Sequence, residues 1–330
     1  MGEKVGDGAS PSGRLRVCHL IHNLGDGGAE RLLIEMAAAA PEAGLEISVV
    51  TMMPNAGKRH ATMLRELGVR VDSLELSHQW DPRGFWRGIE MVRHHEPAVI
   101  HSHLKQADLV GAVVSRELGR PLISTLHMIE SSVSPLGQLK RRLGAEARLR
   151  VATRTIAVSE AQRAWYLDTF RPGRNPVVTI HNGVRAPEPV SEDERVQARR
   201  ELGIGDDDLL ATMLGIMRPG KGHSQLIKAA GLLAPTSRIR FVCAGEGPLL
   251  QQLSMEAAQS SGAHGEQRVL FPGWCSDVSR LLAASDLIVH PTLFDALPTA
   301  LIQGMAAGLP AVASDVGGVS EIVSDGCGLL

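Results

Sequence analysis

Residues 286–308 read DLIVHPTLFDALPTALIQGMAAG, and this stretch contains the unit from which we expect the whole chain to be built. The apolar run 286–291 is followed by a loop and then by the amphipathic run 299–307, an order typical of a strand that leads into a helix. Pro298 suits the first turn of that helix because an N–H at this point has no helical partner to lose. Gly308 is suited to end it. Units of this kind predict a parallel sheet with helices packed on it.

The same alternation extends along the chain in both directions. The expected strands of the first part are RVCHLIHNL (16–24), EISVVTM (46–52), VRVDSLEL (69–76), AVIHSH (98–103), PLISTLH (121–127), TRTIAVS (153–159) and VVTIHNG (177–183). Those of the second part are LLATMLGI (209–216), RIRFVCAG (238–245), RVLFPG (268–273), DLIVHP (286–291) and AVASD (311–315). Each part is predicted to be a doubly wound α/β domain.

The domain boundaries follow from composition. The boundaries that we expect are a flexible tail at 1–14, a first domain at 15–184, a linker rich in proline and acidic residues with the start of a helix at 185–200, and a second domain at 201–330. An apolar strand begins near the last residues, and the second domain is expected to lack its last strand and its closing helices. In open α/β sheets ligands bind at the carboxyl ends of the strands, so a site between the two domains is predicted.

Composition excludes several classes of protein. The 330 residues are 44% hydrophobic and 21% charged, with 34 Lys and Arg against 36 Asp and Glu. This is ordinary for a globular protein, and the near-neutral balance argues against a nucleic-acid partner. The four cysteines lie far apart without a C-x-x-C pair, so neither a disulfide framework nor a zinc finger is expected. With neither a membrane-span pattern nor a signal-peptide pattern, a cytoplasmic location is expected.

A glycine-rich loop follows the first expected strand. Gly27 and Gly28 open a helix there, and glycines at a helix N-terminus allow backbone N–H groups to approach a phosphate. An anion site and a plain strand-to-helix turn are about equally favoured by this loop alone. A nicotinamide-cofactor fingerprint is disfavoured, because Glu30 stands at the third glycine position and the second strand ends in Thr51 rather than an acid.

Four histidines, His22, His101, His103 and His127, lie at the carboxyl ends of expected strands. His101 and His103 share one face of a strand, so they could form a metal pair, but no acid stands at a spacing that completes a ligand set. A substrate contact or a satisfied structural role is the favoured interpretation. His127 is expected to face the site.

Three loops of the second part carry charge or glycine at strand ends. Arg218 and Lys221 lie in a glycine-containing turn that could neutralise a diphosphate, the alternative being a solvated basic turn. The run 245–248, GEGP, is a second turn of close approach. The run 291–299 ends at a helix N-terminus suited to an anion, and Asp295 beside it could hold a polyhydroxylated group.

Taken in order, these motifs resemble those of the retaining GT-B glycosyltransferases of family 4, from residue 15 to 330. The motifs that carry the resemblance are GGAE (27–30), HNGV (181–184), RPGKG (218–222), GEGP (245–248), DALP (295–298), MAAGLP (305–310) and GGVSE (317–321). The resemblance implies two Rossmann-like domains facing across a cleft and transfer of a hexose-type sugar from a nucleoside-diphosphate sugar. It implies no metal and no cofactor.

The resemblance also assigns roles to residues. It implies a donor site mainly on the second domain, formed by Gly27, Gly28, Arg218, Lys221, Gly245, Glu246, Gly247, Asp295, Ala296, Leu297, Pro298, Thr299 and Gln303. His127, Lys221 and Asp295 are implied in catalysis, and we place His22, His101 and His103 on the acceptor side. Retention is implied to proceed by attack on the same face, with the leaving diphosphate taking the acceptor proton, so catalysis is positioning and charge stabilisation.

The chain departs from the family pattern at named positions. The usual Glu-x7-Glu pair appears as Asp295 and Gln303, the arginine expected after Gly215 is Ile216, and the closing helices are expected to be missing. An amide is a weaker acceptor for hydroxyls than a carboxylate. A catalytically weak GT-B module that binds a glycan or a partner without turnover is therefore an alternative, as is a nucleotide-sugar epimerase.

Residues 138–154, QLKRRLGAEARLRVATR, form a helix-like stretch rich in Lys and Arg. Such a helix could rest on an anionic membrane at the inner face and serve a lipid-linked acceptor, or it could be an ordinary solvated helix with arginine stems packed on its neighbours. The acceptor classes that we expect are a glycan, a lipid-linked sugar or a small molecule, as in polysaccharide or cell-envelope biosynthesis.

Overall fold

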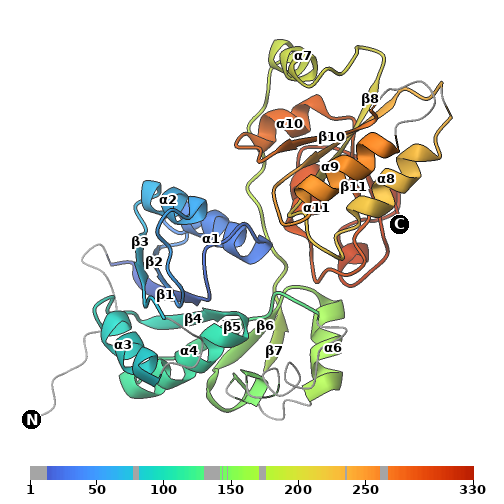
Figure 1. Ribbon diagram of the computed structural model, residues 1–330. Helices are drawn as coiled ribbons and strands as arrows, with labels where there is room; N and C mark the ends of the chain where they lie inside the picture. Colours follow the sequence, from blue (N-terminus) through green and yellow to red (C-terminus); the bar gives the residue numbers. More distant parts are fainter. Residues whose placement is uncertain are drawn as a thin grey trace, which may run out of the picture. The chain divides into compact units, whose positions relative to one another are not determined.

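The computed structural model describes residues 13–76, 82–129, 142, 144–146, 148–170, 176–234, 236–260 and 267–330. The chain divides into two compact units, Met1–Asn182 and Gly183–Leu330 (Figure 1). No helix in the described ranges combines the length and the apolar character that crossing a bilayer requires.

The described residues of the first unit form a seven-stranded parallel sheet with strand order β3-β2-β1-β4-β5-β6-β7. The strands are β1 Leu15–Ile21, β2 Leu45–Thr51, β3 Arg70–Ser73, β4 Val99–His103, β5 Leu122–Thr125, β6 Arg154–Ala157 and β7 Val177–Thr179. The helices with assigned bounds are α1 Gly28–Ala39, α2 Arg59–Glu66, α3 Pro82–Arg93, α4 Leu104–Leu118 and α6 Glu160–Phe170. The strand order reverses between β1 and β4, which makes their carboxyl ends the expected ligand position.

The described residues of the second unit form a six-stranded parallel sheet with strand order β10-β9-β8-β11-β12-β13. The strands are β8 Leu209–Leu214, β9 Ile239–Ala244, β10 Val269–Gly273, β11 Leu287–His290, β12 Ala311–Ala313 and β13 Gly328–Leu329. The helices are α7 Glu192–Glu201, α8 His223–Gly231, α9 Leu250–Gln259, α10 Val278–Ala284, α11 Thr299–Ala306 and the 3-10 turn η1 Val319–Glu321. The order is again the Rossmann order, with its reversal between β8 and β11.

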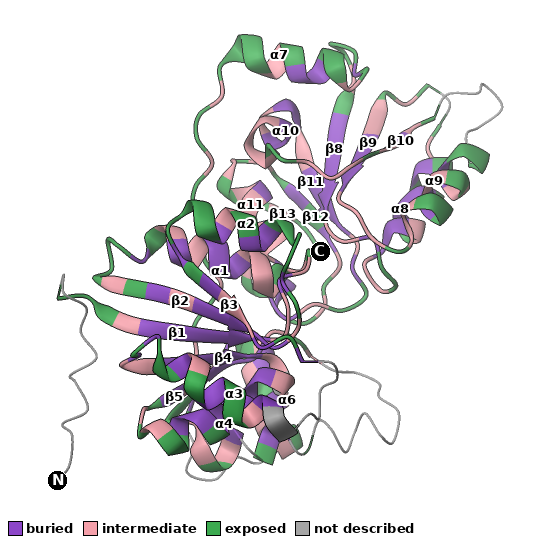
Figure 2. Ribbon diagram, turned by 60° about the vertical axis from the view of Figure 1, so that its left-hand side comes forward, coloured by how far each residue is buried: buried purple, intermediate pink, exposed green. Residues whose placement is uncertain are grey.

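Each sheet has an apolar core on both faces, as a parallel sheet covered by helices requires. Successive residues of a strand point to opposite faces, so Leu20 packs in one cluster with Ile100, while the next residue, Ile21, packs in another with Leu33. The middle strands are almost wholly buried (Figure 2). Because such strands read as continuous apolar runs, every strand predicted from the sequence is found, and the predicted α/β fold class is confirmed. The expectation that the last strand is missing is wrong, because the short strand β13 pairs with β12 at the edge of the second sheet.

Part of the basic segment 138–154 lies outside the described residues, namely 138–141, 143 and 147. Of the described remainder, residues 144–146 and 148–151 are helical, and Arg148 is buried in the first unit. Its guanidinium forms an ion pair with Asp108, and its Nη1 donates to the Tyr166 hydroxyl at 3.2 Å. The membrane interpretation is therefore wrong for Arg148, because a cation that holds a buried carboxylate has no charge to offer a lipid surface.

Candidate functional site

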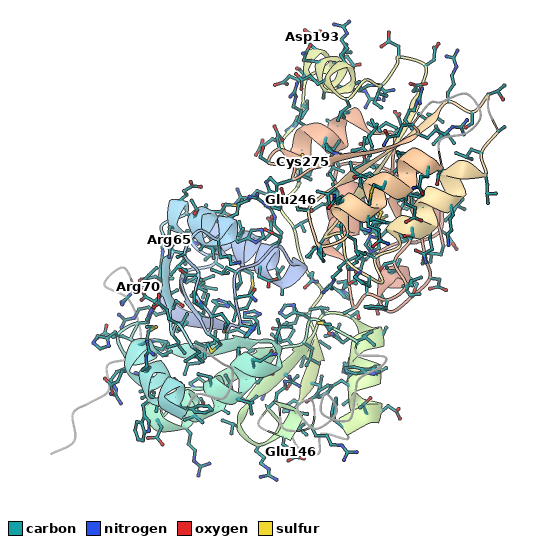
Figure 3. The ribbon with its side chains drawn as sticks, in the orientation of Figure 1. Arg65, Arg70, Glu146, Asp193, Glu246 and Cys275 are labelled. Atoms are coloured by element: carbon teal, nitrogen blue, oxygen red, sulfur yellow. The ribbon has the colours of Figure 1, made fainter. Side chains whose placement is uncertain are left out.

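Three loops of the second unit are joined by backbone hydrogen bonds at the carboxyl edge of the sheet. In the loop after β8, Met217 N donates to Glu246 O of the loop after β9 at 2.9 Å. Leu249 N of the loop after β9 donates to Met217 O at 3.0 Å. The loop after β11 donates from Leu293 N to Gly220 O at 2.9 Å. Glu246 lies in the loop after β9 (Figure 3). The predicted donor residues of the three loops therefore belong to one continuous surface.

Glycine is required where these loops touch. Gly245 has φ +145°, and a Cβ placed on it would lie 2.1 Å from the carbonyl oxygen of Gly215. Gly222 has φ +88°, and its Cβ would lie 1.8 Å from the carbonyl oxygen of Pro291. A side chain at either position would collide with backbone that cannot yield easily. The sequence predicted close approach to a ligand here, and the structure shows close approach between the loops themselves.

Substitution of Gly222 tests this packing. Gly222→Ala is expected to lower the thermal transition of the second unit more than Gly308→Ala does. Both glycines have positive φ, +88° and +82°, but nothing lies within 4 Å of a Cβ on Gly308. Left-handed backbone alone costs a non-glycine residue about 1–2 kcal/mol. Calorimetry of the two variants isolates the cost of the Pro291 collision, and equal transitions would contradict a rigid contact.

Lys221 and Asp295 form a direct ion pair on this surface. Lys221 Nζ donates to Asp295 Oδ2 at 2.5 Å, and the other carboxylate oxygen accepts from Ala296 N at 3.0 Å. His290 Nε2, at the end of β11, lies 3.5 Å from Asp295 Oδ2. Burial raises the pKa of Asp295, but the His290 and Lys221 interactions outweigh it and lower that pKa to about 2. Asp295 is therefore ionised at neutral pH.

The ion pair explains how a carboxylate and an ammonium that are both largely withdrawn from solvent can lie together in this loop region. Their side chains are 15% and 16% exposed, so each charge needs the other. An ammonium has three N–H donors, so Lys221 can hold Asp295 and still donate to a phosphate oxygen. Arg218, in the same loop, is exposed.

Helix α11 begins beside this pair. Pro298 is the N-cap residue, with φ −72° and ψ 111°, directly before the run 299–307 that the sequence predicted to be helical. Its carbonyl accepts from Leu301 N and Ile302 N at 3.1 and 3.2 Å, so the helix starts at Thr299. Ala296, Leu297 and Pro298 are buried and can offer a ligand only backbone. Gln303 lies further along the helix and is half-buried.

In the first unit, the glycine loop after β1 is also held in place. Gly25 N donates to Asn23 Oδ1 at 3.0 Å, and Gly27 is the N-cap of α1, which starts at Gly28. A Cβ on Gly27 would lie 2.3 Å from Glu30 Oε2, so the Glu30 carboxylate rests against this glycine. The helix N-terminus predicted for an anion thus already has a carboxylate of its own chain beside it.

The predicted histidines of the first unit are brought together with a histidine that the sequence analysis missed. His19, inside β1, lies beside His101 in the strand register, and the side chains of His19, His101 and His103 are almost fully buried. His127, after β5, is partly exposed, and His103 Nδ1 lies 2.9 Å from His127 Nε2. His22 is half-buried. The burial of His101 and His103 does not fit direct contact with an acceptor.

Burial also controls the charge of these rings. It lowers the pKa of His101 to about 4 and that of His127 to about 3, and it lowers the pKa of His19 and of His103 well below the usual range. All four rings are therefore neutral at pH 7. One nitrogen from each of His19, His101 and His103 lies within 4.8 Å of the others, a neutral imidazole set of the kind that transition metals take. The sequence could have indicated that His19 belongs to this cluster only if the pairing of β1 with β4 had been known.

Two family models match consecutive parts of the chain. The model of Glycosyltransferase Family 4 matches residues 26–186, and the model of Glycosyl transferases group 1 matches residues 194–330. Among curated proteins, the putative glycosyltransferase EpsF of Bacillus subtilis is 26% identical over 330 residues, which cover 97% of this chain and 83% of that protein. The uncharacterized glycosyltransferase MJ1607 of Methanocaldococcus jannaschii is 26% identical over 236 residues, 68% of this chain and 59% of its own length.

Solved structures share the fold. The Anabaena protein Alr3699/HepE, crystallised with UDP and glucose, superposes with a TM-score of 0.80 and 23% identity, covering 96% of this chain and 85% of that one. The two-domain architecture described above is thus the GT-B fold. With both family models matched in order along it, the chain belongs to the GT4-type GT-B glycosyltransferases.

Proposed function

We propose that the chain transfers a hexosyl group from a nucleoside-diphosphate sugar to an acceptor hydroxyl with retention of configuration. The observation that carries the proposal is the Lys221–Asp295 pair beside the start of α11, at the carboxyl edge of the second sheet. Ligands of doubly wound sheets bind at this edge. Structures of HepE with UDP and with UDP-glucose support a nucleotide-sugar donor, and uridine is the base to test first.

In this proposal, different residues of the second unit bind different parts of the donor. Lys221, with exposed Arg218 near it, supplies positive charge to the diphosphate, and the first N–H groups of α11 add the partial charge of a helix N-terminus. Asp295 accepts hydrogen bonds from sugar hydroxyls, because its carboxylate stays ionised. Gln303 binds a hydroxyl through its amide oxygen, with less strength than a carboxylate would.

The transfer step needs no side-chain nucleophile. The bond from the anomeric carbon to the diphosphate oxygen breaks, the acceptor oxygen bonds to the same face of that carbon, and the acceptor proton passes to the leaving phosphate oxygen. Lys221 and the helix N-terminus stabilise the charge that develops on the leaving group. Since these groups supply the positive charge, we propose that transfer proceeds without a divalent metal and continues in EDTA.

The acceptor belongs to the first unit in this proposal. Curated relatives include one named as acting on a diphosphoundecaprenol-linked sugar and one named for inositol phosphate, so lipid-linked and small-molecule acceptors both have precedents. His22 is the acceptor-side histidine that remains half-exposed. Contact with a membrane would use exposed cations of 138–154 such as Arg150, whose side chain is 79% exposed, and not Arg148.

Calorimetric titration with UDP, GDP and ADP tests the proposal, followed by incubation of the preferred nucleotide's glucose or galactose conjugate. Micromolar binding of one nucleotide is expected, and with an acceptor alcohol present the sugar should be transferred to give a glycoside of retained anomeric configuration, read by NMR. Binding without turnover of any acceptor would favour the catalytically weak module. Conversion of the donor to an epimer would assign an epimerase instead, and absence of binding to all three nucleotides would contradict a donor site.

A further inference from the structure

Lys221 lies between two glycines, and residues 291–295 of the loop after β11, which we call the clamp segment, contact both of them. Gly220 and Gly222 have φ +85° and +88°, a region that glycine enters at no steric cost. The hydrogen bond that closes the turn itself, from Lys221 N to Arg218 O, is long at 3.4 Å. The turn alone therefore does little to fix the direction of the Lys221 side chain.

The carbonyl oxygen of Gly220 is contacted twice by the clamp segment. Leu293 N donates to it at 2.9 Å, and Thr292 Oγ1 lies 3.1 Å from it. The same hydroxyl lies 3.0 Å from Phe294 O, so its single proton is shared between a carbonyl of each loop. Because Thr292 is fully buried, water does not compete for this proton. The hydroxyl therefore links the two loops.

The glycines on both sides of Lys221 are also packed against the clamp segment. A Cβ placed on Gly220 would lie 2.5 Å from Cε1 and Cζ of Phe294, so the ring of Phe294 covers this glycine. The carbonyl oxygen of Pro291 takes the corresponding place at Gly222. Phe294 is 39% exposed, so its ring belongs to the surface next to the turn rather than to the core.

The last residue of the clamp segment, Asp295, holds the Lys221 side chain itself. Lys221 Nζ donates to Asp295 Oδ2 at 2.5 Å. Five consecutive residues thus hold the backbone on either side of Lys221 and its ammonium. A change at Thr292 or Phe294 reaches that ammonium through Gly220.

We propose that Thr292 and Phe294 are positioning residues, which fix the ammonium of Lys221 where it can hold Asp295 and the donor diphosphate together. The inference rests on the proposed function, in which Lys221 binds that diphosphate. A lysine side chain loses conformational freedom when it binds a phosphate, and a backbone that is already fixed reduces the total loss. The clamp segment therefore contributes to nucleotide affinity through Lys221.

Chemical labelling measures the position of Lys221 without a nucleotide. Trace acetylation of the full chain, read by mass spectrometry, compares Lys221 with exposed Lys228 of the same unit. Thr292→Val keeps the side-chain volume and removes the hydroxyl, so it should raise the relative reactivity of Lys221 about three- to tenfold, the effect of one lost hydrogen bond. Thr212→Val is the matched control and should leave the ratio unchanged, because Thr212 is equally buried and its Oγ1 lies 2.6 Å from Ser285 Oγ.

Binding of UDP gives the functional measurement. Thr292→Val should weaken it about three- to tenfold, and Thr292→Ser, which keeps the hydroxyl, should restore it. Added to Lys221→Ala, Thr292→Val should have no further effect, because the cation that Thr292 positions is then absent. An equal further loss in the Lys221→Ala background would indicate a merely structural role and overturn the inference.

Phe294→Ala is the second variant, used if Thr292→Val does not fold, because a partly exposed ring is less costly to remove. It uncovers Gly220 and should change labelling and UDP binding in the same directions. Unchanged Lys221 reactivity in the folded variants would overturn the proposal. If the wild type does not bind UDP, the proposed function fails, while the labelling result still decides whether the clamp segment positions Lys221.

Discussion

Lys221→Ala is expected to weaken binding of UDP about 10- to 100-fold, since a hydrogen bond to a charged group contributes about 1.5–3 kcal/mol. The rate of sugar transfer should fall further, about 100-fold or more, because the charge on the leaving diphosphate is largest in the transition state. The change also removes one of the two interactions that hold the pKa of Asp295 near 2 against burial. Calorimetry gives the first effect, and a coupled assay of released UDP gives the second.

Lys228→Ala is the matched control. Lys228 lies in the last turn of α8, seven residues further along the chain, and is exposed. It carries the same charge, so a change in long-range attraction alone would affect both variants equally. If the two variants bind UDP with the same affinity, Lys221 does not contact the diphosphate. Asp295→Asn distinguishes the proposed role of Asp295, which binds the sugar, from that of Lys221, which binds the diphosphate. This variant should preserve UDP binding and lower the affinity for the nucleotide sugar.

Arg148→Ala is expected to destabilise the first unit by about 3–5 kcal/mol, the usual cost of leaving a buried charge without its partner. Asp108 is fully buried and accepts from Ser102 Oγ and Ser124 Oγ at 2.6 Å each, besides its ion pair with Arg148. Hydroxyls alone do not compensate a buried carboxylate. Denaturation in urea, followed by a probe in the first unit such as Trp165 fluorescence, measures the loss in a variant with Trp274 of the second unit replaced by Phe.

Arg150→Ala controls for loss of helix charge. Arg150 is two residues away, 79% exposed, and pairs with Glu146 at 3.1 Å, so its removal should cost less than about 1 kcal/mol. Adding Asp108→Asn to Arg148→Ala should restore part of the lost stability, since the uncompensated charge is then gone. No restoration would show that packing of the arginine stem, rather than charge, accounts for the effect.

The fold was predictable because its determinants are local. A strand covered on both faces reads as an apolar run, and a helix beside it reads as a longer amphipathic run, wherever either lies in the chain. The turn at 218–222 could also be predicted locally, because Gly220 and Gly222 lie between an expected strand and an expected helix. Helix α11 starts at Thr299 as predicted and ends at Ala306, one residue before the end of the predicted run 299–307, which is the scale on which helix ends vary.

Pairings between distant residues were not predictable in the same way. Lys221 and Asp295 are 74 positions apart, and Arg148 and Asp108 are 40 apart. The sequence analysis singled out Lys221, Asp295 and the segment that contains Arg148 separately, each from its own neighbours, and it did not single out Asp108. His19 lies inside a strand, and only the placement of β1 next to β4 brings it to His103. Such contacts depend on strand order and register, which apolar runs do not encode.

The loops after β8, β9 and β11 meet through backbone atoms, at Gly245 against Gly215 and at Gly222 against Pro291. Their framework therefore depends on a few glycines and leaves the side chains between them free to diversify. Ile216, Pro248 and Leu293 occupy such intervening positions, and Leu293 is 54% exposed. A library varied at these three positions, with the glycines kept, is expected to retain a folded scaffold, which makes this edge a natural starting point for directed evolution of the proposed donor site.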